Sequence, residues 1–589
     1  SYGKKGDAVV QMNWKAIDAG VDAVHKVNVP ESWHNPAPDA APKALKGPDA
    51  LVKQIRDVME PISRMDGDSL PVSAFEGNVN GEWEQGASAY EKRGTAVMVP
   101  EWDAEKCIQC NQCAFVCSHA TIRPFCLTAD EAANAPESTK LADTKPKASE
   151  YKFTMAVSPL DCMGCGECVT VCPTKAIEMK PQESQAAQQA AFDYCVENIR
   201  KKDNIPGVVS DISVKGSQFN QPLLEFSGSC AGCAETSYAR LITQLFGEKM
   251  FISNATGCSS IWGGTASISP YTTNKESGFG PAWINSLFED NAEHGLGMQI
   301  GYETVRANLI TKVEALKGKN ADLDAVIDKY LETKNNTKAN DAPAKALIAA
   351  LEACGCDESK EILKDKQYLA KKSFWIFGGD GWAYDIGYGG LDHVLASGHD
   401  VNVMVFDTEM YSNTGGQASK ASNIGEVCQF AAAGKEISKK SLAEICMTYG
   451  YIYVAQIALG ANMAQAVKAI AEAEAYPGPS IIIGYAPCEL HGVKGGMTNC
   501  QNEMKKAVEA GYWNLFTFNP ALKAEGKNPF TLTSKAGKMD KYQEFLANET
   551  RYSRLSRAFP DRAKALFDKN QEAAEARYTH LTKLVDLYK

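Results

Sequence analysis

The sequence predicts an α/β protein: a small α+β module rich in cysteine, followed by a parallel-sheet domain that a helical insertion interrupts. Two observations favour this fold class. Between residues 226 and 518, short apolar runs alternate with helical patterns, which is typical of a parallel sheet covered by helices on both faces. Of the 19 cysteines, eight form two closely spaced runs between Cys107 and Cys172, which indicates a module built around metal rather than around a large apolar core.

Length, composition and charge restrict the possible partners. The chain has 589 residues and a formal net charge of −11, which argues against nucleic acid or anionic membrane held by bulk electrostatics. No stretch approaches the roughly 18 uninterrupted apolar residues of a membrane span, and residues 1–15 lack the apolar centre of a signal peptide. We therefore expect a cytoplasmic protein that binds neither nucleic acid nor membrane.

Taken in order, the segments suggest five parts. Residues 1–85 open with a helical pattern and continue into a proline-rich stretch, so we expect a strap or linker. Residues 86–181 form the cysteine module, which contains an internal repeat, and 182–225 form a helix-prone connector. The sheet domain spans 226–518 with a helical insertion at 301–372, and 519–589 is expected to be a helical arm. The proline-rich stretch of the first part contains Pro30, Pro36, Pro38, Pro42 and Pro48.

The cysteine module contains two runs with the spacing CxxCxxCxxxC. Three thiolates of such a run can bind one cubane cluster while the fourth binds the other, so two runs predict two [4Fe–4S] clusters. Zinc is the alternative, although its sites more often pair separated CxxC knuckles. The runs resemble bacterial two-cluster ferredoxins, except that Ser118 stands where that family has proline. The expected ligand sets are Cys107, Cys110, Cys113 with Cys172, and Cys162, Cys165, Cys168 with Cys117.

The sheet domain contains a candidate diphosphate site. Gly379, Asp380 and Gly381 follow an apolar run, and a second polar loop, 408–417, follows the next run. A glycine turn lets backbone N–H groups approach phosphate, and an Asp offers oxygen to Mg²⁺. A structural turn is the alternative for either segment alone. Together they resemble the diphosphate-binding motif of thiamine diphosphate enzymes, which implies side-chain oxygens of Asp380 and Thr408 and the backbone carbonyl of Met410 as Mg²⁺ ligands, with Thr408 where many such enzymes have Asn.

A third cluster is suggested by Cys230, Cys233 and Cys258, which provide a CxxC pair and one later cysteine. The spacing leaves the fourth ligand open. Cys488 ends a strand-like run, and ligands gather where parallel strands end, which favours it without excluding the others. The candidates are Cys354, Cys356, Cys428, Cys446, Cys488 and Cys500.

These motifs, in this order along nearly the whole chain, resemble the C-terminal half of pyruvate:ferredoxin oxidoreductases. The resemblance implies Cys488 as the fourth ligand of the third cluster, and it implies that Glu235 and Cys258 lie against thiamine diphosphate. It further implies a catalytic position for Asn413 beside the reacting thiazolium, whereas His491 and Cys500 match nothing and are expected to be structural or surface residues. The other residues expected to line the cofactor are Gly379, Gly381, Trp382, Glu409, Tyr411 and Ser412.

The implied function is the oxidative decarboxylation of pyruvate with coenzyme A to acetyl-CoA and CO₂. Electrons would pass singly through three [4Fe–4S] clusters to ferredoxin or flavodoxin. The family takes a glutamate for the pyrimidine ring from an N-terminal domain that residues 1–225 do not resemble, so we expect that domain on another segment or chain of an oligomer. The alternatives are another 2-oxoacid, the carboxylating direction, and a subunit that only transfers electrons.

Overall fold

A computed structural model describes residues 3, 6–34, 45–146, 150–265, 267–318 and 321–589. Pro36, Pro38 and Pro42 of the predicted strap therefore lie outside the described residues. Contacts divide the chain into two units, Ser1–Val52 and Lys53–Lys589. The first unit contains the helices α1 (Asp7–Asp22) and α2 (Glu31–His34). None of the helices within the described ranges has both the length and the apolar character that crossing a bilayer requires.

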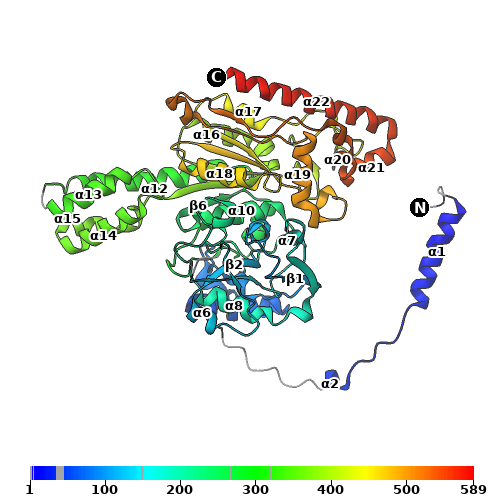
Figure 1. The fold of residues 1–589 in the computed structure, drawn as a ribbon, viewed down its shortest axis with the longest axis horizontal. Coiled ribbons are helices and arrows are strands. Elements are labelled where there is room, and N and C mark those ends of the chain that lie inside the picture. The colour runs from blue at the N-terminus through cyan, green and yellow to red at the C-terminus, as the bar shows by residue number, and fades with distance from the viewer. Residues whose placement is uncertain (1–2, 4–5, 35–44, 147–149, 266, 319–320) are drawn as a thin grey trace. The chain divides into compact units, whose positions relative to one another are not determined.

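The second unit is organised around an eight-stranded sheet with the order β15-β14-β12-β13-β9-β8-β6-β7 (Figure 1). The neighbouring strands from β12 to β7 in this order run parallel, and β14 and β15 add antiparallel pairs at one edge. Strands β8, β9 and β13 are almost wholly buried, as expected for apolar runs covered on both faces. The bounds are β6 (Met250–Asn254), β7 (Ala282–Asn285), β8 (Ser373–Gly379), β9 (Asn402–Asp407), β12 (Tyr453–Ile457), β13 (Ser480–Tyr485), β14 (Phe516–Phe518) and β15 (Phe530–Leu532).

Helices cover both faces of this sheet. In Figure 1, α10 (Ala234–Phe246) and α18 (Met463–Ala475) lie on one side of it, and α16 (Tyr388–Ala396) and α17 (Leu442–Met447) lie on the other. The long helix α12 (Asn291–Glu314) leaves the sheet and continues into α13 (Ala321–Thr333), α14 (Asp341–Cys354) and α15 (Asp357–Leu363), drawn in green. These helices pack around an apolar cluster of their own that includes Leu309, Ile327 and Leu347. The helical insertion is thus a separate small core, and α12 connects it to the sheet.

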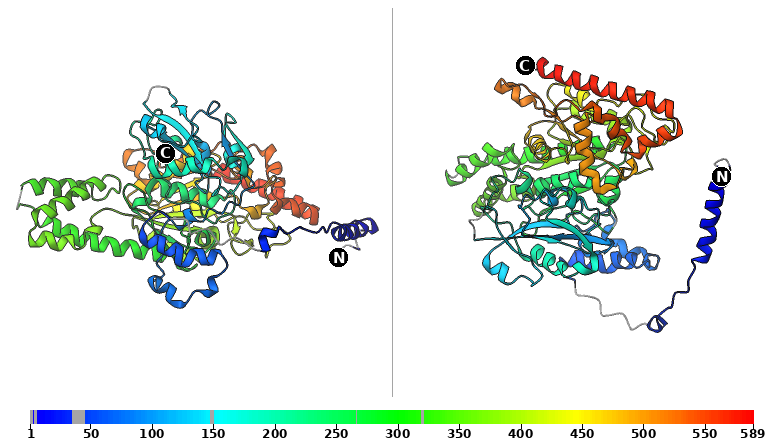
Figure 2. Two further views of the ribbon diagram at one scale, coloured as in Figure 1. Left: turned by 90° about the horizontal axis from the view of Figure 1, so that it is seen from below. Right: turned by 45° about the vertical axis from the view of Figure 1, so that its right-hand side comes forward.

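The C-terminal part departs in one respect from the expected helical arm. Residues 519–589 contribute β15 to the sheet before they form α20 (Tyr542–Ala547), α21 (Thr550–Ala558) and α22 (Pro560–Leu587). Helix α22 contacts β15 and lies along the outside of the sheet domain, in red, in Figures 1 and 2. The helix α21 also carries a buried arginine, Arg551, which pairs with Glu409 and Glu426.

The cysteine module is a small α+β unit. Its repeat forms one strand in each half, β1 (Met98–Trp102) and β5 (Ile177–Pro181), which pair antiparallel, and one short helix in each half, α5 (Gln112–Val116) and α7 (Glu167–Thr170). The residues between the two cysteine runs form a second antiparallel sheet with the order β2-β4-β3, whose strands are β2 (Ile122–Leu127), β3 (Ala142–Asp143) and β4 (Lys152–Val157). The connector contains the helix α8 (Gln188–Asn198).

Helix α10 joins this module to the sheet domain. Its Arg240 is buried and donates a hydrogen bond of 2.5 Å to the carbonyl oxygen of Phe115 in α5. Its Ser237 hydroxyl donates to the carbonyl of Val116 at 3.2 Å. The same helix begins directly after Cys233 and carries Glu235 in its first turn. The packing therefore brings the cysteine module against the segment that holds the third set of cysteines.

Candidate active site

Two loops meet at the carboxyl ends of neighbouring parallel strands. Asp380 follows β8 and Thr408 follows β9, and Gly379 pairs with Phe406 in the register of these strands. The Thr408 hydroxyl lies 2.9 Å from Asp380 Oδ1 and 2.9 Å from the carbonyl oxygen of Met410. The three oxygens predicted to bind Mg²⁺ are therefore brought together. They form an all-oxygen donor set, which is what a hard divalent cation prefers.

The charge around this set calls for a cation. Burial raises the pKa of Asp380 well above its ordinary value, and the nearby Asp407 raises it further, although Ser419, Lys439 and Thr408 act in the opposite direction. The Ser419 hydroxyl donates a hydrogen bond of 2.6 Å to Asp380 Oδ2, and the Ser412 hydroxyl one of 2.7 Å to Thr408 Oγ1. A bound Mg²⁺ would compensate the buried carboxylate directly, so the residues present fit the metal.

A cavity of about 160 Å³ opens beside these oxygens. Gly381 permits close packing on its wall, because a Cβ there would lie 2.6 Å from the ring of Tyr411. The indole N–H of Trp382 is buried without a hydrogen-bond partner among the described residues, and it lies close to Gly387, where a Cβ would be 2.4 Å from Nε1. The lining residues are Glu235, Thr256, Gly257, Cys258, Ser259, Phe288, Gly379, Asp380, Gly381, Trp382, Thr408, Met410, Tyr411, Ser412, Asn413 and Thr414.

One predicted cofactor residue departs from this arrangement. Glu409 does not line the cavity, and its carboxylate instead accepts hydrogen bonds from Asn423 and Tyr512 and pairs with Lys439 and Arg551. Burial by itself would raise the pKa of Glu409, but Lys439 and Arg551 outweigh it and lower the pKa to about 2. The side chain therefore carries a fixed negative charge beneath the site rather than a contact to the ligand.

Glu235 also lines the cavity. Burial raises its pKa to about 7, and its Oε2 accepts a hydrogen bond of 3.4 Å from the indole of Trp262. Trp262 belongs to the short helix α11 (Cys258–Gly263), whose first residue is Cys258. Cys258 thus lines the cavity while it belongs to the third set of cysteines, so that the predicted cluster and cofactor sites share a wall.

The cysteine thiols group as the sequence predicts. Burial raises the pKa of Cys113, and the nearby thiols of Cys110, Cys107 and Cys172 raise it further. Burial also raises the pKa of Cys168, and the nearby thiols of Cys165, Cys117, Cys113 and Cys162 raise it further. Burial and the Glu235 carboxylate raise the pKa of Cys258, and the nearby thiols of Cys233, Cys488 and Cys230 raise it further.

In the first group, Cys172 comes from the other run. In the second group, Cys113 and Cys117 come from the other run, and Cys117 is the fourth ligand expected there. Buried thiols of raised pKa become thiolates when iron supplies the compensating charge. No three His, Cys, Asp or Glu side chains surround a single metal-ion position in the part of the chain that the structure describes. A cubane does not require this, because each iron takes one cysteine.

His491 and Cys500 are not surface residues, because neither has any exposed area. His491 lies between two loops of the site: its Nε2 is 2.8 Å from the carbonyl oxygen of Thr408, and its Nδ1 accepts from the N–H of Cys488 at 3.4 Å. Burial, followed by the charge of Arg551, lowers the pKa of His491 to about 3, so the imidazole is neutral. His491 thereby ties the predicted metal loop to the predicted cluster loop.

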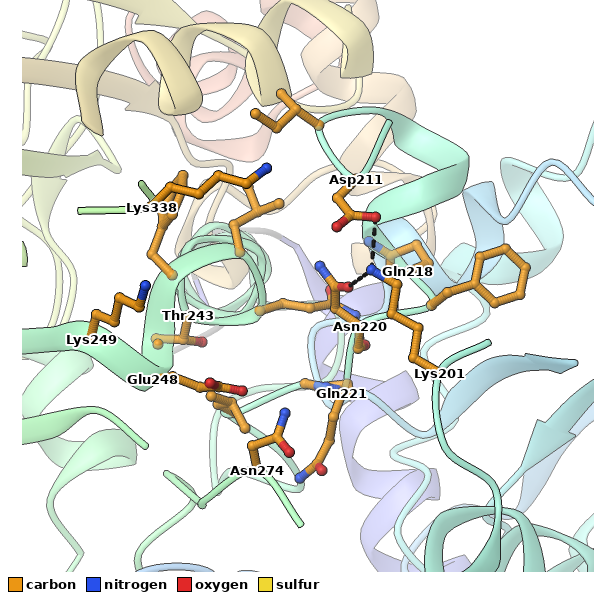
Figure 3. A pocket seen from close by; sticks show the side chains of 18 of the residues that line it. Lys201, Asp211, Gln218, Asn220, Gln221, Thr243, Glu248, Lys249, Asn274 and Lys338 are labelled. Carbon is orange, nitrogen blue, oxygen red and sulfur yellow. Dashed lines mark hydrogen bonds and ion pairs between the residues drawn. The ribbon is translucent and has the colours of Figure 1, made fainter. Parts of the chain in front are cut away.

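A larger cavity, of about 530 Å³, lies at the amino ends of the strands, near the residues that precede β6, β9 and β13 (Figure 3). Its lysines are partly neutralised, since Lys201 Nζ lies 2.8 Å from both Asp211 Oδ1 and Asn220 Oδ1. None of the predicted site residues lines it. Ligands of open parallel sheets bind at the carboxyl ends of the strands, which favours the smaller cavity as the active site.

Comparison with known protein families defines the class. Residues 106–176 match a 4Fe–4S dicluster domain, and 363–483 match the C-terminal TPP-binding domain of thiamine pyrophosphate enzymes. Residues 39–96 match a domain of unknown function. The predicted fold class is confirmed: a mostly parallel α/β domain of the thiamine pyrophosphate type is joined to a ferredoxin-like iron–sulfur module.

Individual relatives are more specific. The chain is 48% identical over 99% of its length to 49% of the pyruvate-flavodoxin oxidoreductase of Klebsiella pneumoniae. It is 48% identical over its whole length to 50% of the pyruvate:ferredoxin oxidoreductase of Moorella thermoacetica, and 44% identical over 99% to 32% of the pyruvate dehydrogenase [NADP(+)] of Euglena gracilis. The resemblance inferred from the motifs is confirmed: the chain is homologous throughout to pyruvate-flavodoxin/ferredoxin oxidoreductases and spans about half the length of the curated relatives it matches.

Proposed function

We propose that this chain carries the diphosphate half of a thiamine diphosphate site and the electron relay of an enzyme that oxidises pyruvate with coenzyme A. The observation that supports it most is the meeting of Asp380, Thr408 and Met410 oxygens beside a cavity whose far wall contains Cys258. Relatives named as pyruvate oxidoreductases match the whole chain, and they favour pyruvate over other 2-oxoacids. We propose the cytoplasm as its location.

The residues have separate tasks in this proposal. Asp380, Thr408 and the Met410 carbonyl would hold Mg²⁺, and Trp382 would line the cavity beside them. Asn413 would face the reacting end, as the family resemblance implies. When bound, thiamine diphosphate supplies the nucleophilic carbon and the electron sink that decarboxylation of a 2-oxoacid requires. Phe288 and Tyr411, whose ring centroids lie 6.0 Å apart, would contribute apolar surface to the lining of the cavity.

The electron relay follows from the three groups of thiols. Cys230, Cys233, Cys258 and Cys488 would hold the cluster nearest the cavity, and the two sets of the cysteine module would hold the others. Helix α10 connects them, since it follows Cys233 and hydrogen bonds to α5. Electrons would leave to an external ferredoxin or flavodoxin.

The pyrimidine half of the cofactor site would come from outside these 589 residues, within an oligomeric assembly. The relatives each hold about twice this length in one polypeptide, which favours a further segment of the same protein over a separate chain. Residues from that segment would also select the 2-oxoacid, so the carboxylating direction and other 2-oxoacids are alternatives to be tested on the assembled enzyme.

Anaerobic purification tests the proposal. About twelve iron atoms per chain are expected, four for each of three cubanes, together with Mg²⁺-dependent binding of thiamine diphosphate. Pyruvate and coenzyme A should then reduce flavodoxin or ferredoxin in the assembled enzyme. Eight iron atoms would remove the cluster nearest the cavity. Twelve iron atoms without any binding of thiamine diphosphate would indicate a subunit that only transfers electrons.

A further inference from the structure

The turn that carries two of the predicted metal ligands has a strained backbone. Glu409 stands between Thr408 and Met410, and its φ of 60° lies in the left-handed region. Glutamate rarely adopts this conformation, and it persists only where the surroundings enforce it. The left-handed residue folds the chain back, so that the Thr408 hydroxyl and the Met410 carbonyl lie 2.9 Å apart. The strain thus accompanies the convergence of the two oxygens.

Four side chains hold the Glu409 carboxylate. Its Oε2 is 2.8 Å from Arg551 and 2.6 Å from the hydroxyl of Tyr512, and its Oε1 is 3.0 Å from Lys439 and 3.0 Å from the amide of Asn423. These partners come from separate segments of the chain, and none of the four lines the cavity. Lys439 also pairs with Asp407 at 2.8 Å, so the residues on both sides of Thr408 are anchored to the same cation.

Arg551 contributes the most distant of these contacts. It belongs to α21 of the C-terminal part, is 2% exposed, and also pairs with Glu549 at 2.6 Å and with Glu426 at 3.3 Å. A planar guanidinium can satisfy several carboxylates at once in a fixed geometry, which a lysine cannot reproduce. The arginine therefore locks Glu409 to two further segments from below the turn.

We propose that Arg551 and Glu409 are positioning residues for the metal ion of the cofactor. Their buried ion pair holds the left-handed turn that presents the Thr408 hydroxyl and the Met410 carbonyl. This inference rests on the proposed function, because it requires that Mg²⁺ and thiamine diphosphate bind there. It gives the C-terminal helices a part in cofactor binding in addition to their contacts with the sheet.

A pair of substitutions at one position isolates the backbone conformation. Glu409→Ala and Glu409→Gly both remove the carboxylate, but glycine adopts a positive φ without strain. In the assembled enzyme, purified anaerobically with its clusters, we expect the Mg²⁺ concentration for half-maximal thiamine diphosphate binding to rise about tenfold or more in Glu409→Ala. The rise in Glu409→Gly should be smaller by about three- to fivefold. Equal rises, or a larger rise with glycine, would overturn the proposal.

A second series tests the arginine. Arg551→Met and Arg551→Lys should raise the Mg²⁺ requirement about tenfold or more, measured through tryptophan fluorescence well below the melting temperature. Arg562→Met is the matched control. Arg562 belongs to the neighbouring helix α22 and makes a partly exposed ion pair with Glu436. A merely structural arginine would lower the melting temperature and leave the Mg²⁺ requirement unchanged, and that result would refute its positioning role.

The two hypotheses fail in different ways. If the unchanged protein binds no thiamine diphosphate with Mg²⁺, the proposed function and this inference both fail. If it binds and the folded variants bind with the same Mg²⁺ requirement, only this inference fails. Should Arg551→Met not fold, Arg551→Lys and the two Glu409 variants decide the question.

Discussion

Two buried carboxylates, one at each end of the strands of the central sheet, have partners of opposite kinds. At the carboxyl ends of the strands, Glu409 pairs with Lys439 and Arg551, and its pKa falls to about 2 although burial opposes this. At the amino ends, Glu474 of α18 accepts hydrogen bonds from Ser373, from the Trp375 indole at 3.1 Å and from the Asn402 amide at 3.2 Å. Burial raises the pKa of Glu474 to about 7.

The difference lies in the partners rather than in the depth of burial. Neutral donors stabilise a carboxylate only in part, whereas full positive charges offset the loss of hydration. Glu409 is therefore a fixed negative charge near the predicted cofactor site, whereas Glu474 gains or loses a proton near neutral pH.

The largest expected effect comes from removing the buried ion pairs of Arg551. Arg551→Met should lower the free energy of unfolding by about 3–5 kcal/mol, because it leaves buried carboxylates without their cation. Urea unfolding of the full chain at pH 7 measures this loss. The control Arg562→Met removes a partly exposed pair and should cost no more than about 1 kcal/mol. Similar losses in the two variants would show that the buried network is not special.

The next effect, at Asp380, separates cofactor binding from the stability of the protein. Asp380→Asn keeps the size of the side chain but removes an anionic ligand, so Mg²⁺-dependent binding of thiamine diphosphate should weaken about 100-fold. Since burial and Asp407 both raise the pKa of Asp380, the protein without cofactor should be as stable as before or more so. Calorimetry gives the binding and thermal unfolding the stability. Asp392→Asn on α16, outside the cavity, should change neither by much.

The smallest effect concerns Glu474 and its uncharged hydrogen-bond donors. The raised pKa of Glu474 contributes stability that is fully present below the ordinary carboxyl pKa of 4.5 and is lost as the pH rises through about 7. Glu474→Gln mimics the protonated group, so it should match the original protein at pH 4 and exceed its stability by about 2–3 kcal/mol at pH 8. Unfolding measured at both pH values tests this, and a variant that is less stable at pH 8 would contradict it.

Local patterns were enough to predict the core of the site. Asp380 and Thr408 follow consecutive strands that also pair in the sheet, so motifs near in sequence become neighbours in space. The cysteine runs group for the same reason, since their spacing is fixed within short loops. The fourth member of the third group needed the family resemblance, because Cys488 is far along the chain and several cysteines were equally plausible by spacing.

Long-range pairing limited the rest. Glu409 was predicted to bind cofactor, whereas its side chain points to Arg551, a partner from the distant helix α21 that no local pattern identifies. Its left-handed backbone had no signal either, because glutamate has no preference for that conformation. The strand β15 was also missed, since Phe530–Leu532 is too short to show an alternating pattern.

The pairing of β9 with β13 has a consequence beyond the fold. Asp407 lies opposite Tyr485, so the Thr408 loop and the Cys488 loop begin one interstrand spacing apart, about 4.8 Å, and His491 bridges them. Main-chain hydrogen bonds, rather than side-chain fit, set this separation. Substitutions that reshape the cavity would therefore leave the distance between the starts of these two loops unchanged.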